Sequence, residues 1–171
     1  MRIPPPFLLI ILFFGLYAFT PSSGSLEERK TELKEIAQKL ANDDDNNSFL
    51  QSLRPTKSDL KTIFNPDAVE TIWKYSENMY STIPKNAIQP NMKQTEIHVY
   101  SALSKDIKDG LTHQLPGGYT RISQRYKDDV IIYGLKYTEP NKPSGYSLNS
   151  FYYLEDHWIC IPKTFRAFTR N

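Results

Sequence analysis

The first half of the chain carries apolar residues at helical spacing. Ser25 and Glu28 form a capping-box pattern, and the apolar positions that follow them predict an amphipathic helix over 26–42. Residues 48–53 predict one short helical turn. Thr56 is typical of a helix cap and predicts a further short helix leading to Phe64.

The longest helical pattern begins at Asn65-Pro66 and ends before Pro84. Asn is a favoured cap and Pro is favoured at the first helical position. The positions that follow repeat at i, i+3, i+4 and i+7, so Trp73 and Tyr80 are expected in the core rather than in a ligand site. The members of this stripe are Val69, Ile72, Trp73, Ser76, Met79, Tyr80 and Ile83.

From Gln94 onward the apolar pattern changes to a period of two, which is typical of strands. One helical turn is expected over 104–110, where Gly110 ends it. The expected strands span 94–101, 120–126, 130–139, 146–155 and 158–163.

The last two strands are expected to form a hairpin with its turn at Asp156-His157. A two-residue turn there places Leu154 opposite Ile159 and Tyr152 opposite Ile161. Both pairs then lie on one side of the sheet, and the hairpin closes the core.

Helices followed by strands predict an α+β fold, with helices on one face of a twisted, mainly antiparallel sheet of four to five strands. We expect one domain over 25–171, with a helical half at 25–84 and a β-rich half at 94–165. This order of elements is similar to the cone-shaped folds of the nuclear-transport-factor and cystatin-like kind. The likeness is one of architecture and transfers no site.

Residues 1–24 have the pattern of a secretory signal peptide. Arg2 precedes the uncharged apolar run Phe7–Phe19, and Pro21 to Ser25 form a small-residue break. The run is shorter than the ~20 residues that a membrane-spanning helix needs. We expect export to the periplasm or the cell exterior, with an uncleaved membrane anchor as the alternative.

The composition excludes few functions but argues against nucleic-acid binding. Lysine and arginine total 21 against 19 acidic residues, a net charge of +2 without a concentrated basic region. Cys160 is the single cysteine, so no internal disulfide can form, and its apolar neighbours predict a buried, inert thiol.

No metal or cofactor is expected. Asp43, Asp45 and Asn47 have the spacing of the first ligands of a calcium loop, but Ser48 and Arg54 stand where that loop needs Gly and Glu. The three histidines are scattered, and no catalytic or nucleotide-binding motif occurs.

Two groups of residues are candidate sites. Glu96, His98 and Tyr100 share one side of the strand over 94–101, where a base and a phenol could line a pocket. The alternative is a solvated outer face of the sheet. The second group is the basic and aromatic tail with Lys163, Arg166 and Arg170, either a surface for an anionic partner or a tail that docks through its phenylalanines.

These observations favour an exported, non-enzymatic binding or interaction domain. The alternative is a small pocket hydrolase or isomerase that uses His98, Tyr100 or Glu96. A further alternative is a domain held at the membrane by its uncleaved leader. We expect the presence or absence of a pocket around His98 to separate the first two.

Overall fold

The computed structural model describes residues 25–43 and 47–169. Its sheet has four strands in the order β1-β2-β3-β4, each antiparallel to its neighbour, which confirms the predicted α+β class. The predicted signal peptide and Arg170 lie outside the described residues. The elements are α1 (Leu26–Ala41), α2 (Ser48–Ser52), α3 (Lys57–Ile63), α4 (Pro66–Thr82), β1 (Glu96–Leu103), α5 (Ser104–Lys108), α6 (Gly118–Arg121), η1 (Ser123–Arg125), β2 (Ile131–Thr138), β3 (Gly145–Leu154), β4 (His157–Cys160) and η2 (Thr164–Phe168).

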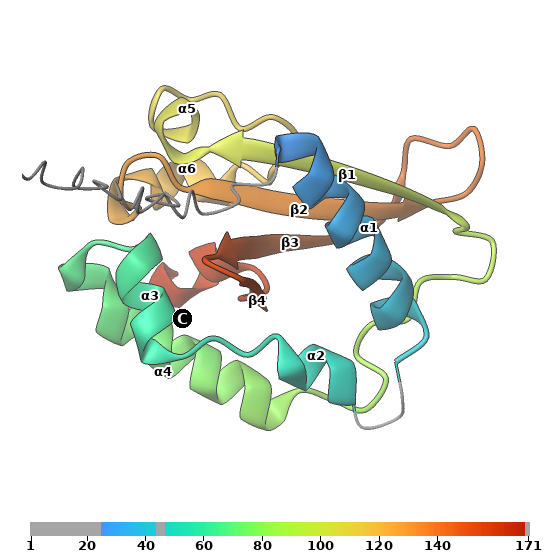
Figure 1. Cartoon of the computed structure of the whole chain (residues 1–171), viewed down its shortest axis with the longest axis horizontal. Helices are drawn as coiled ribbons and strands as arrows, with labels where there is room; N and C mark the ends of the chain where they lie inside the picture. Colours follow the sequence, from blue (N-terminus) through green and yellow to red (C-terminus); the bar gives the residue numbers. More distant parts are fainter. Residues whose placement is uncertain (1–24, 44–46, 170–171) are drawn as a thin grey trace, which may run out of the picture.

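Helices cover both faces of the sheet, not the single face that we expected. On the α1 face, Leu135 and Phe151 belong to one buried cluster with residues of α1 and α2, and the partly buried Val99 packs against it. On the α6 face, Ile132 and Tyr152 belong to a second cluster with α3, α5 and α6. Figure 1 shows α1 crossing in front of the strands, with α3 and α4 below the β4 end of the sheet. Helix α4 contributes to both clusters.

The predicted helix starts are confirmed for α1 and α3. Both have complete capping boxes, Ser25 with Glu28 and Thr56 with Asp59. Asn65 precedes α4 as predicted, but its side chain does not cap that helix. Its amide instead donates to carbonyl oxygens of residues 124 and 126, which ties the start of α4 to the segment before β2.

The strand predicted over 120–126 is wrong. The chain forms α6 and η1 there, and Tyr126 makes only an isolated bridge with Phe64. The physical reason is the spacing of its buried residues. Tyr119, Ile122, Ser123 and Tyr126 are buried, and these positions follow i, i+3, i+4 and i+7, which places all four on one side of a helical path.

The predicted hairpin exists, but its turn is Glu155-Asp156 and not Asp156-His157. Leu154 pairs with His157 and Tyr152 with Ile159, so the register differs by two residues from the prediction. Glu155 adopts a left-handed backbone (φ 47°) that begins the turn. A shift of two residues leaves every side chain on its predicted face, because the side-chain period of a strand is two.

Candidate functional site

A groove lies on the α6 face where no helix covers β1 and β2, and we call it the β1–β2 groove. It has a volume of about 680 Å³. Along β1 the exposure changes from Glu96 and His98, which are exposed, to Tyr100, which is 7% exposed. The lining residues are Glu96, His98, Val99, Tyr100, Gln114, Lys136, Thr138, Asn141, Lys142 and Pro143.

Strand register sets the floor of this groove. His98 lies opposite Lys136, and Glu96 lies opposite Thr138, so their side chains project from the same face. The register therefore brings together the three predicted residues of β1 and adds Lys136 and Thr138 from β2.

Gly134 lets the Tyr100 side chain lie across β2. A Cβ at Gly134 would stand 2.5 Å from Tyr100 Cε2 and 2.7 Å from Asn149 Oδ1. Because that space is open, the Tyr100 hydroxyl reaches β3 and donates to Asn149 Oδ1 at 2.5 Å. Burial raises the pKa of Tyr100 above its usual value, and a hydrogen bond with Ser147 partly offsets this effect.

His98 contacts both of its polar neighbours through one ring nitrogen. Nε2 lies 2.9 Å from Thr138 Oγ1 and 3.4 Å from Glu96 Oε2. A hydroxyl–histidine–carboxylate triad needs the carboxylate on the other ring nitrogen, where it orients the base. The His98 side chain is also 56% exposed, so the groove does not exclude water from it. This arrangement can hold a polar ligand but does not form a triad.

The groove walls have an unusual backbone. His113 and Gln114 are consecutive non-glycine residues with left-handed φ of 47° and 77°, and Asn141 on the opposite wall has φ 63°. A left-handed backbone is uncommon for glutamine, which makes Gln114 the least expected of these conformations. Asp106 of α5 lies next to this loop, with its Oδ2 3.3 Å from His113 Nε2.

The C-terminal tail, as far as Thr169, lies away from this groove and packs against α6 and η1. Phe165 packs edge-on against Tyr119 at 5.2 Å between ring centroids, and the Arg125 guanidinium lies over Phe168. Lys163 and Arg166 remain exposed. None of the tail residues up to Thr169, where the described part of the chain ends, lines the β1–β2 groove, so Lys163 and Arg166 lie apart from it.

A second groove lies between α3 and α4 and has a mainly apolar floor. Its volume is about 500 Å³. Lys57 on its rim pairs with Glu70, whose pKa is lowered by the hydrogen bond and charge of Lys57. Nothing in the sequence pattern separates this groove from an ordinary helix–helix contact. Its lining residues are Lys57, Lys61, Phe64, Pro66, Val69, Glu70 and Lys127.

The remaining chemical candidates have structural roles. Cys160 is buried, and burial raises the pKa of its thiol, as an inert cysteine requires. Asp43 accepts hydrogen bonds from the amides of Phe49 and Leu50 at the start of α2. Across residues 25–43 and 47–169 there is no cluster of three or more His, Cys, Asp or Glu side chains that could hold a metal ion.

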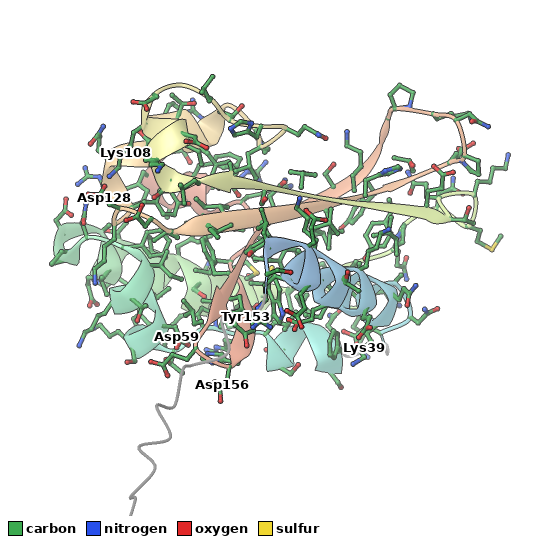
Figure 2. The ribbon with its side chains drawn as sticks, turned by 45° about the horizontal axis from the view of Figure 1, so that its top comes forward. Lys39, Asp59, Lys108, Asp128, Tyr153 and Asp156 are labelled. Carbon is green, nitrogen blue, oxygen red and sulfur yellow. The ribbon has the colours of Figure 1, made fainter. Side chains whose placement is uncertain are left out.

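His157 lies at the tip of the β3–β4 hairpin between two carboxylates. Its ring nitrogens are 3.4 Å from Asp59 and 3.2 Å from Asp156. Figure 2 labels both aspartates at the lower edge of the molecule, next to the hairpin tip. The contact to Asp59 links the hairpin to α3.

Comparisons with known proteins add no relative. No family model, curated protein or solved structure matches the chain. In the part of the chain that the structure describes, no helix has the length and apolar character needed to cross a bilayer.

The sequence pattern identified one strand of the groove and missed the other. Lys136 and Thr138 continue the side of β2 that begins with Ile132 and Gly134, so alternation alone places them on one face. The wall residues Gln114 and Asn141 carried no signal, because they reach the groove through loops whose path the pattern does not predict.

Proposed function

We propose that the protein is an exported, non-enzymatic binding domain whose ligand or partner occupies the β1–β2 groove. Export rests on the apolar run Phe7–Phe19 after Arg2 and on the small-residue break that follows it. Binding rests on the groove itself.

One observation carries the proposal. On the α6 face of the sheet, the part formed by the start of β1 and the end of β2 is open to solvent, carries polar side chains and is bordered by loops. Tyr100 and Ile132 are buried on this face, whereas Glu96 and His98 on the same face are exposed. Gln114 and Asn141, which both have a left-handed backbone, line the groove from two separate loops. Concave sites with a few converging polar groups are the usual form of ligand sites.

The side-chain contacts favour binding over catalysis by His98, Tyr100 or Glu96. Thr138 and Glu96 meet the same nitrogen of His98, and Thr138 is 2% exposed, so it is poorly placed as a nucleophile. The Tyr100 hydroxyl is buried and donates to Asn149. Burial raises its pKa, which makes proton release at neutral pH harder.

The test is a binding map by NMR. The isotope-labelled protein is titrated with small polar fragments: carboxylic acids, amino acids, amino sugars and tripeptides. We expect amide shifts to gather at residues 96–100, 113–115 and 134–142. Lys136→Ala and Gly134→Ala should weaken binding about two- to tenfold, since they remove a donor or displace Tyr100.

Two controls make this map specific. Gly117→Ala adds a Cβ that meets nothing within 4 Å and should leave binding unchanged. The tail variant with Lys163→Ala and Arg166→Ala should also bind normally. Shifts that gather instead at the tail, or at the α3–α4 groove, would overturn the proposal.

A further inference from the structure

The outer edge of β1 is an unpaired sheet edge. All eight residues of β1 pair with β2 in continuous register and without a bulge, and β1 is the first strand of the sheet. Among the described residues, no backbone hydrogen bond from outside the sheet reaches 96–103. A strand in this position presents a row of free N–H and C=O groups to any extended chain.

The opposite edge of the sheet is closed. Strand β4 has four residues, and the Cys160 amide donates to the Leu53 carbonyl at 2.8 Å. Strand β1 (EIHVYSAL) contains no proline, no lysine and no bulge, and Glu96 at its start is its one charged side chain. The fold therefore protects one edge and leaves the other available.

Two grooves flank the same segment of this edge. The β1–β2 groove lies on the α6 face, and a smaller one of about 290 Å³ lies between α1 and β1. We call the smaller one the α1–β1 groove, and both are lined by His98 and Val99. Its residues are Glu27, Lys30, Thr31, Lys34, Ile97, His98 and Val99.

An added strand would use both grooves at once. Successive side chains of a strand point to opposite faces of the sheet. A chain paired with residues 96–99 would therefore place alternate side chains in the β1–β2 groove and in the α1–β1 groove. Main-chain hydrogen bonds then supply affinity and the two grooves supply selectivity, as in other strand-addition complexes.

The charges around the edge favour an acidic occupant. Four lysines and two glutamates line the two grooves. Lys30 pairs with Glu27 and Lys142 with Glu139, whereas Lys34 and Lys136 make no ion pair within the described residues. Pairing of β1 with β1 of a second copy would bring two lysine-rich surfaces together, and like charges at an interface oppose association.

We propose that β1 binds an extended, acidic peptide segment of a partner protein as a fifth strand of the sheet. The inference rests on the proposed function, because it names the partner class for the same site. Since the lysines are at the surface, binding should weaken as salt rises.

The probe is a fluorescent decapeptide of alternating threonine and glutamate, followed by anisotropy at low ionic strength. We expect Lys34→Glu and Lys136→Glu each to weaken binding about two- to fivefold, the range for exposed charge pairs. Lys74→Glu, on the exposed surface of α4, is the matched control and should have no effect. Circular dichroism checks that each variant is folded.

Two further peptides separate strand addition from general attraction. A decapeptide with proline in place of threonine keeps the charge but loses main-chain donors, and it should bind at least tenfold more weakly. A threonine–lysine decapeptide should not bind. Equal binding of the proline peptide, or no amide shifts at 96–99, would overturn the inference.

The outcomes also separate this inference from the proposed function. Fragments that bind in the β1–β2 groove while the acidic peptide does not would reject strand addition and leave the proposed function standing. Self-association in sedimentation experiments, with β1 amides protected from exchange, would show that a second copy takes the edge and would reject the acidic partner.

Discussion

Among the described residues, buried polar side chains are almost all paired, and several of these pairs hold two distant segments together. Tyr119 hydrogen-bonds to Ser150, and Tyr126 to Tyr152 at 3.0 Å between hydroxyl oxygens. Ser150 itself has a left-handed backbone (φ 73°) at the point where the β2–β3 register shifts. An unpaired hydroxyl in the same interior therefore stands out.

Ser76 of α4 is that exception. Its hydroxyl is the one buried side-chain oxygen or nitrogen without a hydrogen-bond partner among the described residues. We expect Ser76→Ala to raise the free energy of unfolding by about 0.5 kcal/mol, because alanine removes an unsatisfied group and has the higher helix propensity. Urea denaturation measures the change.

Ser81→Ala on the same helix is the control for that measurement. The Ser81 hydroxyl donates to the Asn78 carbonyl in an exposed position, so only the helix propensity changes appreciably. A loss of more than about 1 kcal/mol in Ser76→Ala would mean that the hydroxyl has a partner in solution.

Single elements were predictable where a local pattern determines them. The capping box of Ser25 marks the start of α1, Pro66 and the apolar stripe mark α4, and alternation marks β1 to β3. The helical spacing of the buried residues in 119–126 is only two turns long, and the burial of Tyr119 and Tyr126 that defines it comes from tertiary contacts with Phe165, Phe64 and Tyr152. The groove likewise depends on loops that meet only in the folded chain.

The position of α1 depends on a contact that the sequence does not show. Glu32 accepts hydrogen bonds from Arg29 at 2.5 Å and from the Trp158 indole at 3.0 Å. The Arg29 guanidinium lies 3.7 Å from the centre of the Tyr153 ring, and Figure 2 places Tyr153 beside α1. These contacts join α1 to the β3–β4 hairpin.

This junction should weaken in acid. Burial raises the pKa of Glu32, but the hydrogen bonds from Arg29 and Trp158 outweigh it and lower the pKa below the usual value. A carboxylate with a lowered pKa stabilises the fold above its unfolded pKa, and this stabilisation disappears as the pH falls through the folded pKa. We therefore expect the urea concentration at the midpoint of unfolding to decrease once the pH is below about 4.5.

Glu32→Gln tests the assignment. It should cost roughly 0.5 kcal/mol at neutral pH, a small value because the carboxylate is partly exposed and screened. It should also flatten the loss of stability in acid. Glu35→Gln, exposed on the same helix, should keep the acid dependence of the unmodified protein. Identical acid profiles for both variants would contradict the role of Glu32.

At the scale of the whole molecule, tyrosine supplies several of the largest side chains of the core. Tyr119, Tyr126, Tyr137 and Tyr152 are among the largest fully buried side chains, and they occur in both clusters. Their hydroxyls bridge distant segments, as when Tyr137 donates to the Ala37 carbonyl and Tyr80 to the Cys160 carbonyl. The rings fill the core, and the hydroxyls fix the helices against the sheet.

A core built on tyrosine should open in alkali. Burial raises the pKa of nine tyrosines, those at positions 75, 80, 100, 119, 126, 133, 137, 146 and 152, and it brings Tyr133 and Tyr152 to about 12. An acid whose pKa is raised by folding stabilises the fold below its unfolded pKa, about 10 for tyrosine, and this stabilisation is lost at higher pH. The folded protein should therefore form little tyrosinate near pH 10. At higher pH it should form tyrosinate cooperatively, over the same pH range in which circular dichroism reports unfolding. The guanidinium-denatured chain is the reference and should titrate in one step near pH 10. If the folded protein follows the same curve with its circular dichroism unchanged, the tyrosines are accessible and the two-cluster core is wrong.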